Sequence, residues 1–206
     1  MKTSGLLARA ATGMAGGVLL LGVAGAALAA EVGTDDVDVS VAIEEQEPVG
    51  ALTMSVAADA TTLTEVESGE EDVRRFDGTL PTVTVTDDRE EVPADTYWYV
   101  VGQASDFVNE EGGIIPAEHL GWAPAILTEG EGEVTPGDQV DTVLDEGPNN
   151  VGLVGEELLA LNLSAADARP TGTWDANAAL FLKTPSDIEG GNYTSKITLT
   201  LWEESF

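Results

Sequence analysis

Carboxylates are the reactive groups that this sequence supplies in the greatest number. The chain has 38 acidic residues against eight basic ones, and its formal net charge is −30 at pH 7. Two carboxylates that flank a glycosidic bond can act as acid and base in its hydrolysis, but so acidic a chain contains many pairs by number alone. The composition therefore favours no particular pair, and a carbohydrate-active hydrolase is only a minor alternative.

Histidine and cysteine chemistry is even more restricted. His119 is the only histidine, and the chain has no cysteine. A Ser-His-Asp triad would have to use His119, yet the nearest upstream serine is Ser105 and nothing around His119 resembles a nucleophile elbow. A single histidine cannot form a His-rich metal site, and thiol chemistry is excluded. We therefore expect a protein that is not an enzyme.

Two short acidic clusters carry the hard oxygen ligands that calcium prefers. The first contains Asp35, Asp36 and Asp38, and the second contains Glu131 and Glu133 on either side of Gly132. Neither cluster has the spacing of an EF-hand loop, and solvated acidic loops are commoner than calcium sites. We expect no cofactor, with calcium left open at these two clusters.

Aromatic side chains are the other candidates for ligand contact, because a flat ring can stack on the apolar face of a sugar. The chain has four tryptophans. Large aromatics also dominate the cores of β-sandwiches, and we expect core positions for Trp98 and Trp174. Trp122 lies in a Gly- and Pro-containing segment and is expected to be exposed, whereas Trp202 could face either way.

A charged motif, Asp87-Asp88-Arg89, follows one of the expected strands. An arginine can hold a carboxylate with two parallel hydrogen bonds and so fix a turn, which is the interpretation that we favour. A role in binding is the alternative. The candidate binding residues from the sequence are therefore Trp122, Trp202, Asp88, Arg89 and Trp98.

The elements that must position these residues are mostly strands. Apolar and polar residues alternate with period two, the signature of half-buried strands, at residues 36–43, 51–57, 81–86, 97–101, 173–183 and 193–202. Gly- and Pro-containing turns separate these runs. Residues 155–168 could form a helix or a strand. The pattern predicts an all-β fold, an antiparallel β-sandwich of Ig-like or related topology with long acidic loops.

The first 30 residues have the three parts of a secretory signal peptide. Lys2 and Arg9 give a positive start, residues 17–28 are apolar, and Ala27-Leu28-Ala29 is a small-x-small cleavage pattern. We expect one domain over residues 31–206, of which 31–50 form an N-terminal strand and an acidic lead-in. The predicted product is secreted or at the cell surface, without a membrane anchor after cleavage.

Charge narrows the partners of this product. Nucleic acids and anionic lipid surfaces carry the same sign as the chain and would repel it. Charge therefore argues against these two classes of partner and leaves further copies of the chain possible. Self-association could use an exposed strand edge or a donated strand at residues 36–43.

Several stretches, taken in order, resemble the WxL domain of Gram-positive surface proteins, over roughly residue 52 to the C-terminus. They are residues 83–89 (VTVTDDR), 97–100 (YWYV), 104–107 (ASDF), 115–122 (IPAEHLGW) and 193–201 (YTSKITLTL). The Trp-x-Leu tripeptide of that family is replaced here by Trp98-Tyr99-Val100 and Leu199-Thr200-Leu201. The resemblance implies a secreted β-rich domain that associates noncovalently with the cell wall, through peptidoglycan, often beside partner surface proteins. A self-assembling subunit of a filament or surface layer is the alternative.

Overall fold

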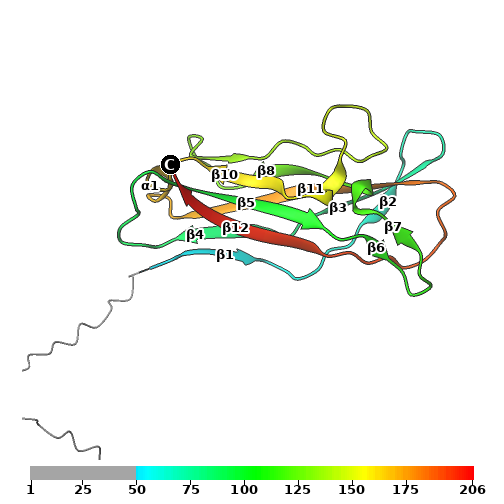
Figure 1. The fold of residues 1–206 in the computed structure, drawn as a ribbon, viewed down its shortest axis with the longest axis horizontal. Coiled ribbons are helices and arrows are strands. Elements are labelled where there is room, and N and C mark those ends of the chain that lie inside the picture. The colour runs from blue at the N-terminus through cyan, green and yellow to red at the C-terminus, as the bar shows by residue number, and fades with distance from the viewer. Residues whose placement is uncertain (1–49) are drawn as a thin grey trace, which may run out of the picture. The chain divides into compact units, whose positions relative to one another are not determined.

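The computed structural model describes residues 50–206. The predicted signal peptide, the strand expected at residues 36–43 and the acidic cluster at residues 35–38 lie outside this range. The described residues form two antiparallel sheets that pack face to face as a β-sandwich (Figure 1), which confirms the predicted fold class. Among these residues, no helix is long and apolar enough to cross a membrane.

One layer, the β11 sheet, is built around the longest strand of the domain. Its strands are β1 (Leu52–Val56), β4 (Val83–Asp87), β11 (Thr173–Pro185), β3 (Val73–Thr79) and β2 (Thr64–Val66), in that order, with β8 (Leu120–Ile126) also on β11. Ala176 pairs with both β4 and β8, and Leu180 pairs with both β3 and β8. Strands β4 and β3 therefore follow one another along one edge of β11, and β8 occupies the other edge.

The second layer, the β5 sheet, has four strands in the order β12, β5, β10 and β9. Their bounds are Ile197–Ser205, Thr96–Ala104, Glu157–Asn162 and Val134–Pro136. A separate pair, β6 (Phe107–Val108) and β7 (Ile114–Ile115), lies at one end. Three short helices complete the described part: η1 (Ala117–His119), η2 (Gly152–Val154) and α1 (Ala165–Ala168).

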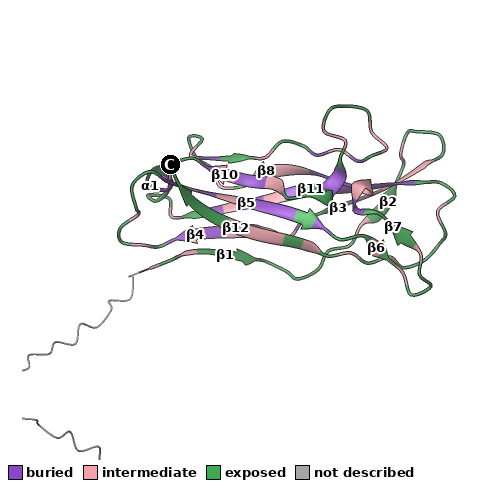
Figure 2. Ribbon diagram, viewed as in Figure 1, coloured by how far each residue is buried: buried purple, intermediate pink, exposed green. Residues whose placement is uncertain are grey.

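Strict alternation explains why these segments form strands. Along β4, Val83 and Val85 are buried while Thr84 and Thr86 are half-buried on the opposite face. The same period places the even-numbered residues of β11, from Trp174 to Leu182, in the core. Figure 2 shows this burial concentrated on β5 and β11, in the centre of the two sheets. The inner faces meet in one cluster of apolar side chains.

The structure corrects several expectations about local elements. Asp77-Gly78, one of the Gly-containing pairs expected to form turns between the predicted strands, lies inside β3. Strand β12 begins at Ile197 rather than at residue 193. The ambiguous segment 155–168 holds both a strand, β10, and the four-residue helix α1. The segment around Trp122 is not a loop but strand β8, because seven of its residues pair with β11.

Candidate binding face

The two sheets differ in the side chains that they turn outward. The β11 sheet turns outward polar residues such as Thr84, Thr86, Asp175 and Asn177, none of which is fully buried. The β5 sheet turns outward a group of aromatic residues. Monomeric proteins keep exposed apolar patches small unless the patch has a function. The outer surface of the β5 sheet is therefore a candidate binding site within the described surface.

The pairing of β5 with β12 brings these aromatics together. Trp98 is buried, so its neighbours Tyr97 and Tyr99 point outward. On β12, Trp202 stands directly opposite Tyr99, and Glu204 stands opposite Tyr97. Side chains at directly opposite positions on one face lie close enough to contact each other. A register shift by one residue would separate the aromatic group.

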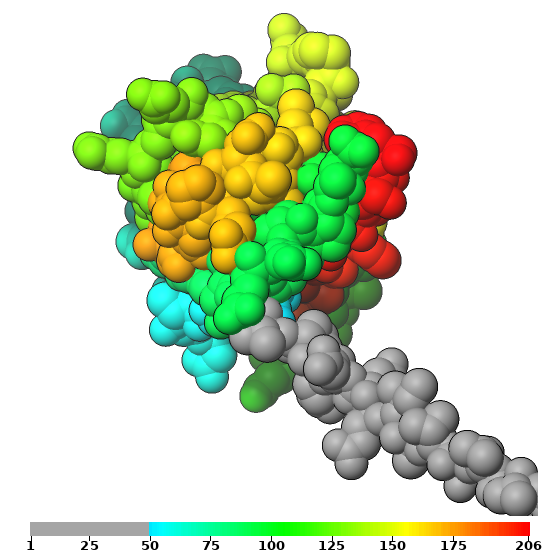
Figure 3. Space-filling view, turned by 90° about the vertical axis from the view of Figure 1, so that its left-hand side faces the viewer, coloured from blue at the N-terminus to red at the C-terminus, as the bar shows by residue number. Residues whose placement is uncertain are grey.

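We call Tyr97, Tyr99, Trp202 and Phe206 the aromatic face. The rings of Tyr97 and Phe206 are 4.7 Å apart between centroids and 28° from parallel, and those of Tyr97 and Tyr99 are 6.1 Å apart and 19° from parallel. Trp202 is 43% exposed and Phe206 is 81% exposed. In the end-on view, the red C-terminal strand lies beside the green segment that leads into β5 (Figure 3).

Glu204 fixes the two tyrosines of the aromatic face. Its Oε2 accepts a hydrogen bond from the Tyr97 hydroxyl at 2.5 Å, and its Oε1 accepts one from the Tyr99 hydroxyl at 2.8 Å. These hydrogen bonds lower the pKa of Glu204, that from Tyr97 most. The bond to Glu204 raises the pKa of Tyr97, and it raises the pKa of Tyr99 to about 12. The carboxylate therefore stays ionised and both hydroxyls stay protonated near neutral pH.

This arrangement suits one kind of ligand chemistry. The exposed rings of Trp202 and Phe206 offer apolar surface on which the C–H face of a pyranose ring can stack. The hydroxyls of Tyr97 and Tyr99 and the carboxylate of Glu204 lie at the same surface and can exchange hydrogen bonds with sugar hydroxyls. Thr200 continues the same outward row on β12.

The structure places two of the predicted binding residues in the core. Trp122 is 0% exposed and Trp98 is 1% exposed, so neither can contact a ligand, and the expected exposure of Trp122 is wrong. Its backbone exchanges two hydrogen bonds with Val140, each of 2.9 Å. Its ring packs so closely over Gly102 that a Cβ there would lie 2.6 Å from Trp122. Trp174, predicted to be buried, is 4% exposed.

Asp88 and Arg89 are engaged within the protein. The ion pair expected within Asp87-Asp88-Arg89 is present, and it joins Arg89 to Asp87. The Arg89 guanidinium donates to Asp87 at 2.8 and 2.7 Å and lies 2.7 Å from Glu203. Asp88 instead accepts a 2.6 Å hydrogen bond from the backbone N–H of Ala51.

Of the two acidic clusters proposed for calcium, the one at Glu131 and Glu133 lies within the described residues, and its geometry does not support a calcium site. Glu133 accepts a 2.7 Å hydrogen bond from the backbone N–H of Glu131, a contact local to that loop. Within residues 50–206, no three acidic or histidine side chains are arranged to hold a metal ion. His119 is also engaged, with its Nδ1 2.7 Å from the carbonyl oxygen of Lys183.

Sequence reasoning identified one member of the aromatic face, Trp202, and missed Tyr97, Tyr99, Glu204 and Phe206. A signal for the tyrosines was present, since they alternate with Trp98 in an expected strand. Once Trp98 is assigned to the core, the flanking tyrosines must face outward. Which strand lies beside them could not be read from the sequence.

Comparisons with known proteins place the chain near no described family. No family model and no curated protein matches it. Among solved structures, it is similar to a chain of the chaperone–tip adhesin complex of CFA/I fimbriae biogenesis, at 11% identity and a TM-score of 0.43, over 73% of this chain and 41% of that one. It is also similar to a family 123 glycoside hydrolase from Clostridium perfringens, at 13% identity and a TM-score of 0.32, over 62% and 18%. The chain spans less than half the length of either, and similarities this low carry no functional conclusion.

Proposed function

We propose that this chain is a secreted, noncatalytic surface protein that binds a cell-wall glycan, peptidoglycan in the first instance, through the aromatic face. The observation that carries the proposal is the outward-facing set of Tyr97, Tyr99, Trp202 and Phe206, on a sheet whose opposite layer turns outward polar residues. Trp202 and Phe206 are exposed, and the two tyrosines are half-buried. The predicted signal peptide at residues 1–30 supports export.

The negative charge of the protein favours uncharged wall polymers over anionic ones. A formal charge of −30 repels anionic polymers such as teichoic acids, whereas uncharged sugar faces in a glycan strand are not repelled. The carboxylate of Glu204, which lies within the aromatic face, adds a local reason for this preference. We expect binding to improve when anionic polymers are stripped from the wall.

The test is retention on purified peptidoglycan, with and without its anionic polymers. Aromatic residues at the centre of a contact surface commonly contribute about 2 kcal/mol or more. Trp202→Ala and Tyr99→Ala should each weaken retention by at least about tenfold. Val66→Ala is a matched control, because Val66 is 40% exposed but lies on β2 of the other sheet.

Two results would overturn the proposal. One is full retention of both aromatic variants, which would exclude the aromatic face as the binding site. The other is release of soluble sugar fragments by the wild-type chain, which would make the protein a hydrolase. Retention of Glu204→Gln tests the charge of this side chain separately from its size. Glu204 accepts the hydrogen bonds of both tyrosine hydroxyls, and the glutamine keeps its size but not its charge.

A further inference from the structure

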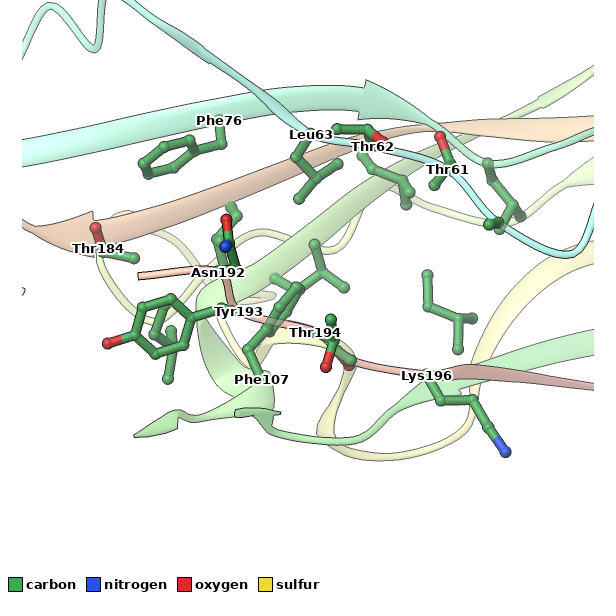
Figure 4. Close-up of a pocket in the computed structure, with 18 of the residues that line it drawn as sticks. Thr61, Thr62, Leu63, Phe76, Phe107, Thr184, Asn192, Tyr193, Thr194 and Lys196 are labelled. Carbon is green, nitrogen blue, oxygen red and sulfur yellow. The ribbon is translucent and has the colours of Figure 1, made fainter. Parts of the chain in front are cut away.

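A second surface of the domain is hollowed rather than flat. Between the β1 edge of one sheet and residues 188–199, which lead into β12 of the other sheet, lies a groove of about 910 Å³. Figure 4 shows Phe76 and Leu63 on one wall, and Tyr193 and Phe107 on the other. All four pack against the main core while remaining partly accessible. The groove is thus an opening into the apolar interior of the sandwich.

The groove is open because both layers end there in strands with a free edge. Within residues 50–206, β1 pairs only with β4, and β12 pairs only with β5. Val56, near the end of β1, is 42% exposed although its neighbour Met54 packs on the core. Free strand edges beside apolar surface invite a further strand, and proteins usually cover or blunt them. The site therefore fits an extended peptide that adds to β1 and inserts apolar side chains.

We infer that this groove receives residues 36–43 from a second copy of the chain. This segment precedes the described residues and alternates strictly, with Val37, Val39, Val41 and Ile43 on one face. An added strand buries alternate side chains in the groove while its backbone pairs with the edge. The other face of the segment carries polar or small residues, including Asp36 and Asp38, which suit solvent.

Charge favours the groove over other surfaces as the docking site for an acidic segment. Arg74 and Lys196 line it, together with Asp59 and Glu189, so its lining is formally neutral. The Arg74 guanidinium is already paired with Glu65, at 2.8 and 3.0 Å. The whole chain carries −30, so most of its surface would repel residues 36–45, which contain four acids. Lys196 is therefore the basic side chain of the lining that is left to meet the acidic segment.

The residues that join this segment to β1 disfavour pairing within one chain. A two-residue hairpin loop at Pro48-Val49 would need a positive φ at its first position, which the proline ring forbids. A three-residue loop suits Gly50, whose φ is 86°, but would set Ile43 opposite Ser55 and turn the apolar face outward. A four-residue loop would require Glu47 to be helical, which a following proline disfavours.

A groove on one copy and a donated strand on the next make a head-to-tail contact. Such heterologous contacts close into rings or continue into filaments, depending on the rotation between neighbours. The inference is independent of glycan binding, because it uses β1 and residues 188–199 rather than the outer face of the β5 sheet. A surface protein with both features would be multivalent for the wall.

The experiment uses the natural absence of cysteine. The chain is expressed from Met1 in a secreting host, with Val41→Cys in the segment and Val56→Cys on β1, and is oxidised at increasing concentration. We expect a ladder of disulfide-linked multimers, and a linked dimer when the two single variants are mixed. Ser55→Cys in place of Val56→Cys is the matched control, since Ser55 faces away from the groove, and it should couple far less.

Light scattering without cross-linking provides the second measurement. The wild-type chain should show a mass that rises with concentration, and Val39→Asp with Val41→Asp should remain monomeric. Ser40→Asp with Ala42→Asp adds the same charge on the opposite face and should still associate. A disulfide formed only within monomers, or a wild-type chain that is monomeric and does not couple, would overturn the inference. Retention of the monomeric variant on peptidoglycan would leave glycan binding intact.

Discussion

Arg89, just after the end of β4, lies against Glu203 on β12, with 2.7 Å between its Nη1 and the Oε1 of Glu203. The same guanidinium holds Asp87 by two hydrogen bonds. Because β4 and β12 belong to different sheets, this cluster ties the two layers together. The side chains of Arg89 and Asp87 are 13% and 7% exposed, so water screens the pair poorly.

Removing the guanidinium should destabilise the sandwich strongly. In Arg89→Met the apolar volume is largely kept, but Asp87 is left as a buried charge without its partner. We expect a loss of about 3 kcal/mol in the free energy of unfolding, measured by urea denaturation. Arg75→Met is the control, since the Arg75–Asp77 pair is more than one-third exposed on both sides and should lose less than about 1 kcal/mol. Equal losses in both variants would contradict the bridging role.

The same cluster should make stability depend on pH. The hydrogen bond from Arg89 lowers the pKa of Asp87 below its ordinary value. A carboxyl with a lowered pKa stabilises the fold above its unfolded-state pKa, and this stabilisation is lost as the pH falls through the folded-state pKa. Protonation of other acids also relieves repulsion, so the informative quantity is the stability difference between wild type and Arg89→Met. This difference in stability should become smaller as the pH falls below about 4. A difference that does not change with pH would contradict the role given to the Arg89–Asp87 pair.

Tyrosine titration reports on the aromatic face directly. The Tyr99 hydroxyl, bonded to Glu204, has a pKa raised to about 12, and that of Tyr97 is raised by the same carboxylate. The stabilisation from these bonds is present below about pH 10 and is lost as the pH rises through the folded-state values. Ultraviolet absorbance should show two late-ionising tyrosines in wild type. Glu204→Gln should move them to lower pH, and an unchanged curve would exclude the hydrogen bonds.

The buried and exposed tryptophans should behave oppositely. Trp122→Ala empties a core position that is 0% exposed and should cost about 3–5 kcal/mol of stability. Trp202→Ala removes a ring that is 43% exposed and should cost less than about 1 kcal/mol while weakening glycan retention. Thermal denaturation and the retention assay together separate the two roles. Comparable destabilisation by both changes would place Trp202 in the core instead.

Lys183 provides a further test of packing. Its ammonium, 7% exposed, lies 2.5 Å from Glu70 and 2.6 Å from Asp145, so it joins β11 to two loops. Burial acts to raise the pKa of Asp145, yet the hydrogen bonds from Lys183 and Thr142 outweigh it and lower that pKa. Lys183→Met should lower the free energy of unfolding by about 3 kcal/mol. Lys196→Met, at an exposed position, should change stability by less than about 0.5 kcal/mol.

Sequence patterns predicted most of the sheet architecture and little of the site. Period-two alternation located β1, β4, β5, β11 and β12 within a few residues, because one face of each strand is buried and the other is not. Strand β3 was missed, since its Arg74-Arg75 and Asp77-Gly78 read as polar and turn-like. Strand β8 was missed because its Gly and Pro are breakers in most contexts; Ala123 and Pro124 pair here beside the long β11.

The sequence by itself determined that the chain is acidic, lacks cysteine, builds an all-β fold and has the pattern of an export signal, because composition and periodicity are local properties. Only the tertiary structure decided the places of Trp122 and Trp202. It buried Trp122 over Gly102, and it set Trp202 opposite Tyr99 beside Glu204. It also opened the groove between β1 and residues 188–199. These relations join residues far apart in the chain, and strand order and register arise from the packing of the whole domain.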